Sequence, residues 1–242
     1  MTDRLSAQDA SFLYGESAVA HMHVGSLILF EPLDLDEVSF REHIESRLHL
    51  VPRFRKKLAW VPGGLGRPVW IDDSDFDLRF HIRASGLAEP CEMEQAQKLM
   101  ARIMSVPLDR QRPLWEMWLF RLHDGRTGII QKTHHALIDG MSGVDVGTVM
   151  LDFSPEPVHI EAPRFEPKAQ PSRAQLMRDA IGEIVRKPSD VVEAIFSRRG
   201  ATGGSAREEA SAVAKGLLSF GKASLEFAPR TPLCAPIGAH RR

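Results

Sequence analysis

The sequence predicts a layered α/β fold, in which a mixed β-sheet flanked by helices is followed by a helical C-terminal region. Two apolar segments of strand composition, 115–122 and 128–133, are joined by an Asp-Gly turn, which is typical of a β-hairpin. Apolar residues recur at helical spacing over 89–104 and again after residue 172. A Pro-rich, charged stretch without periodicity lies between these parts and indicates a linker. We therefore expect a strand-containing domain over 1–153, a linker over 154–171 and a helical connector over 172–242.

The first part of the domain is expected to begin with a helix, a strand and a second helix. Residues 6–17 mix apolar and polar side chains in a way that suits a short capped helix, and the apolar run 21–30 predicts a strand. A helix is expected over 34–50, because Asp34 and Asp36 open it and Val51-Pro52 ends it. Its buried side is expected to contain Val38, Phe40, Ile44 and Leu48.

Short strands are expected next, at 58–61 and 68–71, on either side of a Gly-rich turn. Residues 75–83 alternate with a period of two, which predicts a further strand. Its apolar face would contain Phe76, Leu78, Phe80 and Ile82, and His81 would lie on the opposite face in an ordinary role.

The second part of the domain is expected to support one histidine-bearing strand. The helix over 89–104 ends before Pro107, and Pro113 biases Arg112 to an extended backbone, so that this stretch sets the register of strand 115–122. The turn 123–126 then places strand 115–122 beside strand 128–133. A helix is expected over 144–151, with an N-terminus that favours negative charge.

The candidate catalytic group follows strand 128–133 directly, as His134 and His135. A histidine titrates near neutral pH, so a fixed imidazole can accept a proton from a hydroxyl or a thiol. Neighbouring residues of an extended chain point to opposite faces, so only one of the pair can face a given pocket. The pattern therefore indicates one catalytic and one structural histidine. Asp139, at a tight turn, is read as an orienting group that forms backbone hydrogen bonds or pairs with an arginine.

Metal binding is the alternative for the histidines. Adjacent histidines rarely chelate one ion, so we expect no metal at His134 and His135. His21 and His23 share one face of their strand and could bind an ion. Without an evident third ligand, a hydrogen-bonded structural role is the favoured interpretation.

Composition excludes several classes of function. The chain has 31 Lys and Arg against 32 Asp and Glu, a formal charge of −1, which gives no reason to expect nucleic acid as a partner. Its two cysteines form no zinc or disulfide pattern, which indicates a reducing compartment. No apolar run has the length of a signal-peptide core or a membrane span. We expect a cytoplasmic protein, with any membrane contact peripheral at the inner face.

Several separated segments resemble a known family. His134-His-Ala-Leu-Ile-Asp139-Gly140 matches the HHxxxDG signature of CoA-dependent acyltransferases with the chloramphenicol-acetyltransferase-like fold. The surrounding segments resemble the bacterial wax ester synthase/diacylglycerol acyltransferase family more closely. They are Leu5–Leu13, Met22–Gly25, Pro113-Leu114-Trp115, Pro229–Leu233 and Gly238–Arg242. The resemblance covers essentially the whole chain.

The resemblance implies acyl transfer from a long-chain acyl-CoA to diacylglycerol or a fatty alcohol, giving triacylglycerol or a wax ester. His135 would be the general base, His134 and Gly140 would shape the loop, and Asp139 would stabilise it. The segment Pro113-Leu114-Trp115 would support the motif. Donors for the oxyanion are expected near Ser142 and Gly143. Acyl-CoA would be a co-substrate, and neither a cofactor nor a metal is expected.

Family members are expected to be about twice as long, with a second half of similar fold that carries an Asn-Asp motif. A fragment, half of a split protein and a remnant therefore remain open as readings of this chain. The implied partners include a complementary C-terminal half or a second copy, and peripheral contact with a membrane or a lipid droplet.

Two other functions remain as alternatives. In the first, the chain is a non-catalytic domain or half-enzyme that binds lipid or a partner. In the second, the histidine motif performs condensation on a carrier-bound thioester, as in peptide synthetases. The absence of carrier-domain sequence and the segments Leu5–Leu13 and Pro113–Trp115 argue against the second.

Overall fold

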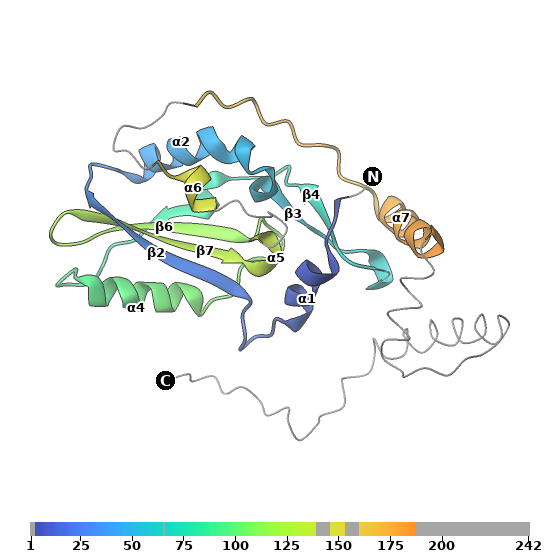
Figure 1. Ribbon diagram of the computed structural model, residues 1–242, viewed down its shortest axis with the longest axis horizontal. Helices are drawn as coiled ribbons and strands as arrows, with labels where there is room; N and C mark the ends of the chain where they lie inside the picture. Colours follow the sequence, from blue (N-terminus) through green and yellow to red (C-terminus); the bar gives the residue numbers. More distant parts are fainter. Residues whose placement is uncertain (1–2, 65, 139–145, 153–159, 187–242) are drawn as a thin grey trace, which may run out of the picture. The chain divides into compact units, whose positions relative to one another are not determined.

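The computed structural model describes residues 3–64, 66–138, 146–152 and 160–186 (Figure 1). Two compact units divide the chain, Met1–Arg173 and Ala174–Arg242, and the boundary falls at the first residue of helix α7 (Arg173–Arg186). Helix α7 agrees with the helix expected after residue 172. The further helices expected beyond it lie outside the described residues. Within the described ranges, no helix combines the length and the apolar character needed to cross a bilayer.

The main sheet of the first unit is mixed, as predicted. Its strands are β2 (His23–Pro32), β5 (Ile82–Ala84), β6 (Trp115–Arg121) and β7 (Arg126–His134), in the order β2-β7-β6-β5. Strand β7 pairs antiparallel with β2 and β6, whereas β5 pairs parallel with β6. The predicted hairpin is confirmed, because Trp115 lies opposite Thr133 and Gly125 adopts a positive φ of 87° in the turn.

A second, smaller sheet has the antiparallel order β1-β4-β3. Its strands are β1 (Asp3–Arg4), β3 (Lys56–Ala59) and β4 (Val69–Asp72). The short strands expected at 58–61 and 68–71 are therefore confirmed as neighbours. The 3-10 turn Pro62–Gly64 lies in the connection between them.

Local capping explains where the longer helices begin. Helix α1 (Ala7–Gly15) follows Ser6, whose side chain accepts from the Asp9 N–H, and α2 (Glu37–Arg47) follows Asp36, which accepts from the Ser39 N–H. Helix α4 (Met93–Met104) opens with reciprocal bonds between Glu92 and Gln95. These three helices confirm the expected ones. A 3-10 turn, Leu48–Leu50, continues α2 to the predicted end of its helix, and a second, Pro52–Arg55, follows it.

The expected strand over 75–83 is wrong. The side chain of Asp77 accepts from the Arg79 N–H and starts the short helix α3 (Leu78–His81), so that only Ile82–Ala84 joins the sheet. His81 is fully buried instead of ordinary. Val38, expected on the buried side of its helix, is 54% exposed. Residues i and i+2 lie about 200° apart around a helix axis, so Val38 points away from the core when Phe40 faces it.

Two apolar clusters cover the two faces of the main sheet. Alternate residues of β6, such as Trp115 and Met117, pack in the cluster that includes Phe40 and Ile44 of α2. Phe120 packs in the other cluster, with residues of α4. Figure 1 shows α4 on one side of the sheet, and α2 with α6 (Val146–Met150) on the other. The layered arrangement holds the end of β7 from both sides.

The described part of the Pro-rich stretch, 160–172, has no helix or strand. It contacts the end of β4 and the residues that follow, because the Lys168 N–H donates to the Asp72 carboxylate at 3.0 Å and the side-chain amide of Gln170 donates to the Ser74 hydroxyl at 3.2 Å. The guanidinium of Arg55 lies 4.7 Å from the ring centre of Phe165. This stretch therefore runs along the surface of the first unit.

Candidate active site at the ends of β2 and β7

Backbone hydrogen bonds fix the position of the histidine pair. The His134 N–H donates to the carbonyl of Leu114 at 3.0 Å, and the His135 N–H donates to the carbonyl of Met22 at 2.9 Å. His134 is the last residue of β7, and His135 is the first residue of the short helix α5 (His135–Ile138). The segment before β6 and the segment before β2 thus hold the two histidines from opposite sides.

Trp115 anchors this arrangement in the core. Its side chain is completely buried, its indole N–H donates to the carbonyl of Phe54 at 2.8 Å, and its ring stacks on His81 at 4.5 Å between centroids. Pro113 and Leu114 are buried beside it. The structure therefore brings Pro113, Leu114 and Trp115 to the histidine pair through backbone pairing with β7.

His134 is a buried, hydrogen-bonded side chain. Its Nδ1 accepts from the Ala136 N–H at 3.0 Å, so the neutral ring carries its proton on Nε2. That atom lies 3.6 Å from Oε2 of Glu16. Burial lowers the pKa of His134, although the Glu16 carboxylate opposes this shift. The geometry gives His134 a fixed orientation.

His135 lies in a different environment from its neighbour. Its imidazole is half-buried and stacks on Phe12 of α1, with 4.8 Å between ring centroids and 18° between planes. Helix α1 packs against α5, which brings Phe12 to this position. The expectation that the two histidines face different surroundings is confirmed, and His135 is the more accessible of the pair.

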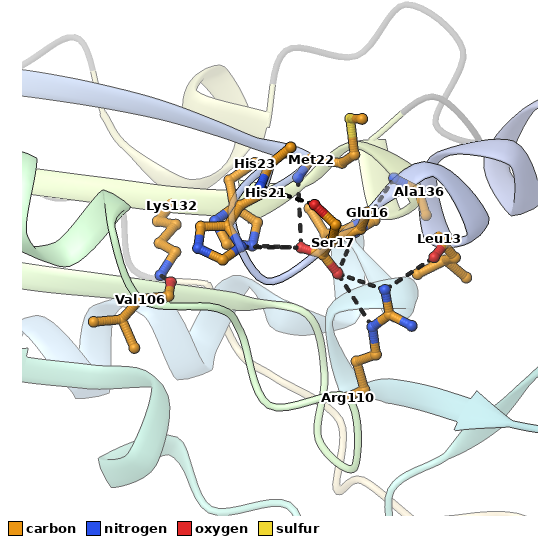
Figure 2. Close-up of polar contacts among 12 residues, drawn as sticks. Leu13, Glu16, Ser17, His21, Met22, His23, Val106, Arg110, Lys132 and Ala136 are labelled. Atoms are coloured by element: carbon orange, nitrogen blue, oxygen red, sulfur yellow. Dashed lines mark hydrogen bonds and ion pairs between the residues drawn. The ribbon is translucent and has the colours of Figure 1, made fainter. Parts of the chain in front are cut away.

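A buried carboxylate, Glu16, lies beside His134. Figure 2 shows it among Arg110, His21 and His23. Glu16 caps the C-terminus of α1, and its Oε2 accepts from Nη2 and Nε of Arg110 at 2.6 and 3.1 Å. Nη2 of Arg110 also donates to the carbonyl of Leu13 at 2.9 Å. Burial acts to raise the pKa of Glu16, but the hydrogen bonds and charges of Arg110 and the nearby histidines outweigh it, so the pKa lies below its ordinary value.

His21 and His23 complete this cluster. His23 lies opposite His134 in the β2–β7 pairing, and its Nε2 is 3.2 Å from Oε1 of Glu16. Burial, followed by the charge of Lys132, lowers the pKa of His23 to about 4, so its ring is neutral near pH 7. The expectation that no third metal ligand lies near His21 and His23 is wrong, because the end of α1 brings Glu16 between them and His134.

Lys132 supports the same strand from within the core. Its side chain is fully buried, and its ammonium donates to the carbonyls of Ile103 and Val106 and to Glu116. These three acceptors satisfy the ammonium group. They also connect the C-terminal end of α4 to β7, two residues before His134.

Asp139, Gly140, Ser142 and Gly143 lie outside the described residues, so their expected roles remain predictions. Sequence reasoning missed Glu16, Arg110 and Lys132. Glu16 and Arg110 are 94 residues apart, and no spacing rule connects them. The weak signal for Glu16 in the sequence is its position between two segments that carry the family resemblance, Leu5–Leu13 and Met22–Gly25.

A groove of about 530 Å³ lies between α4 and the start of β6, lined in part by Phe80, Leu99 and Trp118. Its lining includes Glu116 but neither histidine of the pair. The histidine pair therefore lies outside this groove.

Comparisons with known proteins agree with the sequence resemblance. Residues 5–242 match the model of the wax ester synthase/diacylglycerol acyltransferase catalytic domain. The probable diacylglycerol O-acyltransferase tgs3 of Mycobacterium tuberculosis is 35% identical over an alignment of 255 residue positions, which covers 100% of this chain and 90% of tgs3. The probable diacylglycerol O-acyltransferase tgs2 of the same organism is 36% identical over 191 residues, which cover 74% of this chain and 41% of tgs2.

A solved structure shares the fold. The wax ester synthase/diacylglycerol acyltransferase from Marinobacter aquaeolei aligns with a TM-score of 0.50 and 30% identity, over 57% of this chain and 36% of that one. This match confirms the predicted fold class, a layered α/β half of the chloramphenicol-acetyltransferase type. The chain spans less than half of tgs2 and of the Marinobacter enzyme but nearly all of tgs3. The expectation that relatives are about twice as long is therefore wrong for tgs3.

Proposed function

Because this chain belongs to the wax ester synthase/diacylglycerol acyltransferase family, we propose that it transfers an acyl group from a long-chain acyl-CoA to a hydroxyl group. The proposed acceptors are diacylglycerol, which gives triacylglycerol, and fatty alcohols, which give wax esters. The names of the relatives support an O-acyltransferase. The acyl-CoA donor and the residue that accepts the proton are finer parts of the proposal.

The proposed reaction is a direct attack without a covalent enzyme intermediate. His135 takes the proton of the acceptor hydroxyl as its oxygen forms a bond to the thioester carbonyl carbon. The carbon–sulfur bond of the tetrahedral intermediate then breaks, and the proton from the imidazolium goes to the CoA thiolate. The products are an ester and free CoA. No cofactor beyond the acyl-CoA co-substrate takes part.

The observation that carries this proposal is the difference between the two histidines. Nδ1 of His134 accepts a backbone hydrogen bond and Nε2 faces a buried carboxylate, so neither nitrogen is available to a substrate. His135 is half-buried, and its ring is held by stacking on Phe12 and by its backbone bond to Met22. A general base needs a fixed position and an accessible nitrogen, and these contacts favour His135.

Further residues complete the proposal. Asp139 and Gly140 hold the loop after His135, and backbone groups near Ser142 and Gly143 donate to the oxyanion. Because tgs2 and the Marinobacter enzyme are longer than this chain, the proposed partner in forming the acyl tunnel is a complementary C-terminal half or a second copy of this chain. Peripheral contact with a membrane or a lipid droplet would supply the lipid substrates.

The proposal is tested by incubating the purified 242-residue chain with labelled palmitoyl-CoA and either diacylglycerol or hexadecanol. A parallel sample contains the C-terminal half of a longer relative. We expect labelled ester, with release of one CoA per ester, in at least one sample. Product from the chain alone would mean that these residues suffice. Failure to form ester with both acceptors, with and without the second half, would contradict the proposal and favour a binding role.

A further inference from the structure

The side chains of Glu16, His21 and His23 converge at the start of β2 (Figure 2). His23 lies opposite the buried His134 in the β2–β7 pairing. One potential ligand atom from each residue lies within 4.8 Å of the other two. Their side chains are 7%, 13% and 1% exposed, so the cluster is nearly enclosed. We propose that these three residues bind a divalent transition-metal ion of the zinc type.

The first argument is the arrangement of lone pairs around Glu16. Nε2 of His21 lies 3.1 Å from the carbonyl of Ser105, and a carbonyl only accepts, so this nitrogen carries the proton of the neutral ring. The other nitrogen, Nδ1, then presents a lone pair to Oε1 of Glu16 at 3.9 Å. Two acceptors that face each other in a buried site need a cation between them, either a proton or a metal ion.

The second argument is the state of His23. Its side chain is 1% exposed, yet neither ring nitrogen has a hydrogen-bond partner. Buried polar atoms in folded proteins are nearly always satisfied, so a buried imidazole whose nitrogens make no hydrogen bond is suited to bind an ion. Nε2 of this ring is directed to the same carboxylate oxygen, 3.2 Å away. A neutral imidazole is also the form that binds metal ions.

The third argument is the support around the ligands. The carbonyl of Ser105 orients His21, while Arg110 occupies Oε2 of Glu16 and leaves Oε1 toward the histidines. The Met22 N–H donates to Oε1 at 3.4 Å. Metal-binding histidines and carboxylates usually have such outer hydrogen bonds, which hold the ligands in place.

The ligand types indicate the class of ion. Two imidazoles and one carboxylate suit Zn²⁺ or Co²⁺, whereas Mg²⁺ and Ca²⁺ prefer oxygen ligands. Ligand atoms about 3.4 Å apart would surround a tetrahedral zinc ion with bonds of about 2.1 Å. The rings of His21 and His23 are stacked at 5.2 Å with 11° between planes, so at least one must turn for both lone pairs to meet the ion. The charges of Arg110 and Lys132 oppose the ion and reduce its affinity.

The test uses the full chain without an affinity tag, freed of metal by a chelator and titrated with Zn²⁺ in a calorimeter. Co²⁺ serves as a spectroscopic probe of a tetrahedral site, and Mg²⁺ as a comparison ion. We expect one Zn²⁺ per chain, a Co²⁺ absorption spectrum typical of tetrahedral coordination, and no measurable Mg²⁺ binding. His23→Gln and His21→Gln should each weaken Zn²⁺ binding at least about tenfold.

The matched control is His123→Gln, at an exposed histidine in the β6–β7 turn, which should bind Zn²⁺ as the wild type does. His21 lies at the edge of the cluster, so its variant keeps the test valid if His23→Gln fails to fold. Absence of saturable Zn²⁺ binding would mean that a proton alone lies between the rings and the carboxylate. Binding that survives both substitutions would place the ion elsewhere. Either result overturns the proposal, without reference to acyl transfer.

Discussion

At the scale of single residues, adjacent histidines differ because one ends a strand and the other begins a helix. His134 is buried with both ring nitrogens directed to protein groups, whereas the ring of His135 lies against Phe12 and stays half-buried. The alternation of side chains along a strand is enough to predict that the two histidines face different surroundings. The ring partners from outside the motif could not be predicted, because Phe12 belongs to α1 and Glu16 caps that helix.

Trp115 offers a direct measure of how firmly the β7 end is anchored. Trp115→Phe keeps an aromatic ring but leaves the buried carbonyl of Phe54 without its donor at 2.8 Å. We expect the free energy of unfolding in urea to fall by about 1–3 kcal/mol. Trp60→Phe is the matched control, because Trp60 is 44% exposed and its substitution should have little effect. Equal losses in the two variants would contradict this role of the indole N–H.

His81 predicts a dependence of stability on pH. Burial lowers the pKa of His81 to about 4, against the partial opposition of its bond to the Trp115 carbonyl. The unfolded chain, with a pKa of about 6.5, therefore binds more protons between pH 6.5 and 4, and stability falls as pH falls through this range. The cost from His81 is absent above about pH 7 and reaches about 2 kcal/mol at pH 5.

The measurement for His81 is the free energy of unfolding of wild type and His81→Phe at pH 7.5 and pH 5. The phenyl ring keeps the stacking on Trp115 but does not titrate. The loss of stability between the two pH values should be smaller in the variant, although His23 preserves part of it. His123→Gln should keep the full loss. An unchanged difference in His81→Phe would contradict the buried neutral state.

At the scale of elements, two glycines in paired strands lie against side chains that differ in how easily they can move. A Cβ on Gly128 in β7 would lie 2.1 Å from the ring of Phe120, which is 3% exposed in the core. A Cβ on Gly25 in β2 would lie 2.6 Å from Sδ of Met104, near the flexible end of that side chain. The ring of Phe120 cannot move without disturbing its cluster, whereas Met104 can change rotamer.

We therefore expect Gly128→Ala to lower the free energy of unfolding by about 1–3 kcal/mol, and Gly25→Ala to lower it by less. Chemical denaturation of the two variants beside the wild type measures the difference. A larger loss in Gly25→Ala would show that Met104 yields less readily than the ring of Phe120. That outcome would contradict the predicted order of the two variants.

Most elements could be predicted from local patterns, because capping residues and apolar spacing act over a few residues. Ser6, Asp36 and the hairpin turn at Gly125 mark their elements in the sequence and in the structure alike. The stretch 75–83 could not be predicted in this way. Its alternating pattern favours a strand, but the cap from Asp77 and the burial of His81 against Trp115 stabilise a helical turn instead.

At the scale of the whole molecule, the site combines segments that lie far apart in the sequence. The histidine pair and its supporting segment, Pro113–Trp115, could be identified because their residues are contiguous. Glu16 and Arg110 could not, because only the packing of α1 beside the ends of β2 and β7 brings them together. The share of each relative that this chain matches also differs, at 90% of tgs3 and 41% of tgs2.

The most direct test of the central claim, that His135 is the general base, compares acyl-transfer rates of His135→Gln and wild type in whichever assembled form is active. Loss of a general base should reduce the rate by about 10²- to 10⁴-fold, while circular dichroism shows an unchanged fold. His123→Gln removes an exposed imidazole and should keep the wild-type rate. A His135→Gln variant that keeps the wild-type rate would contradict the claim.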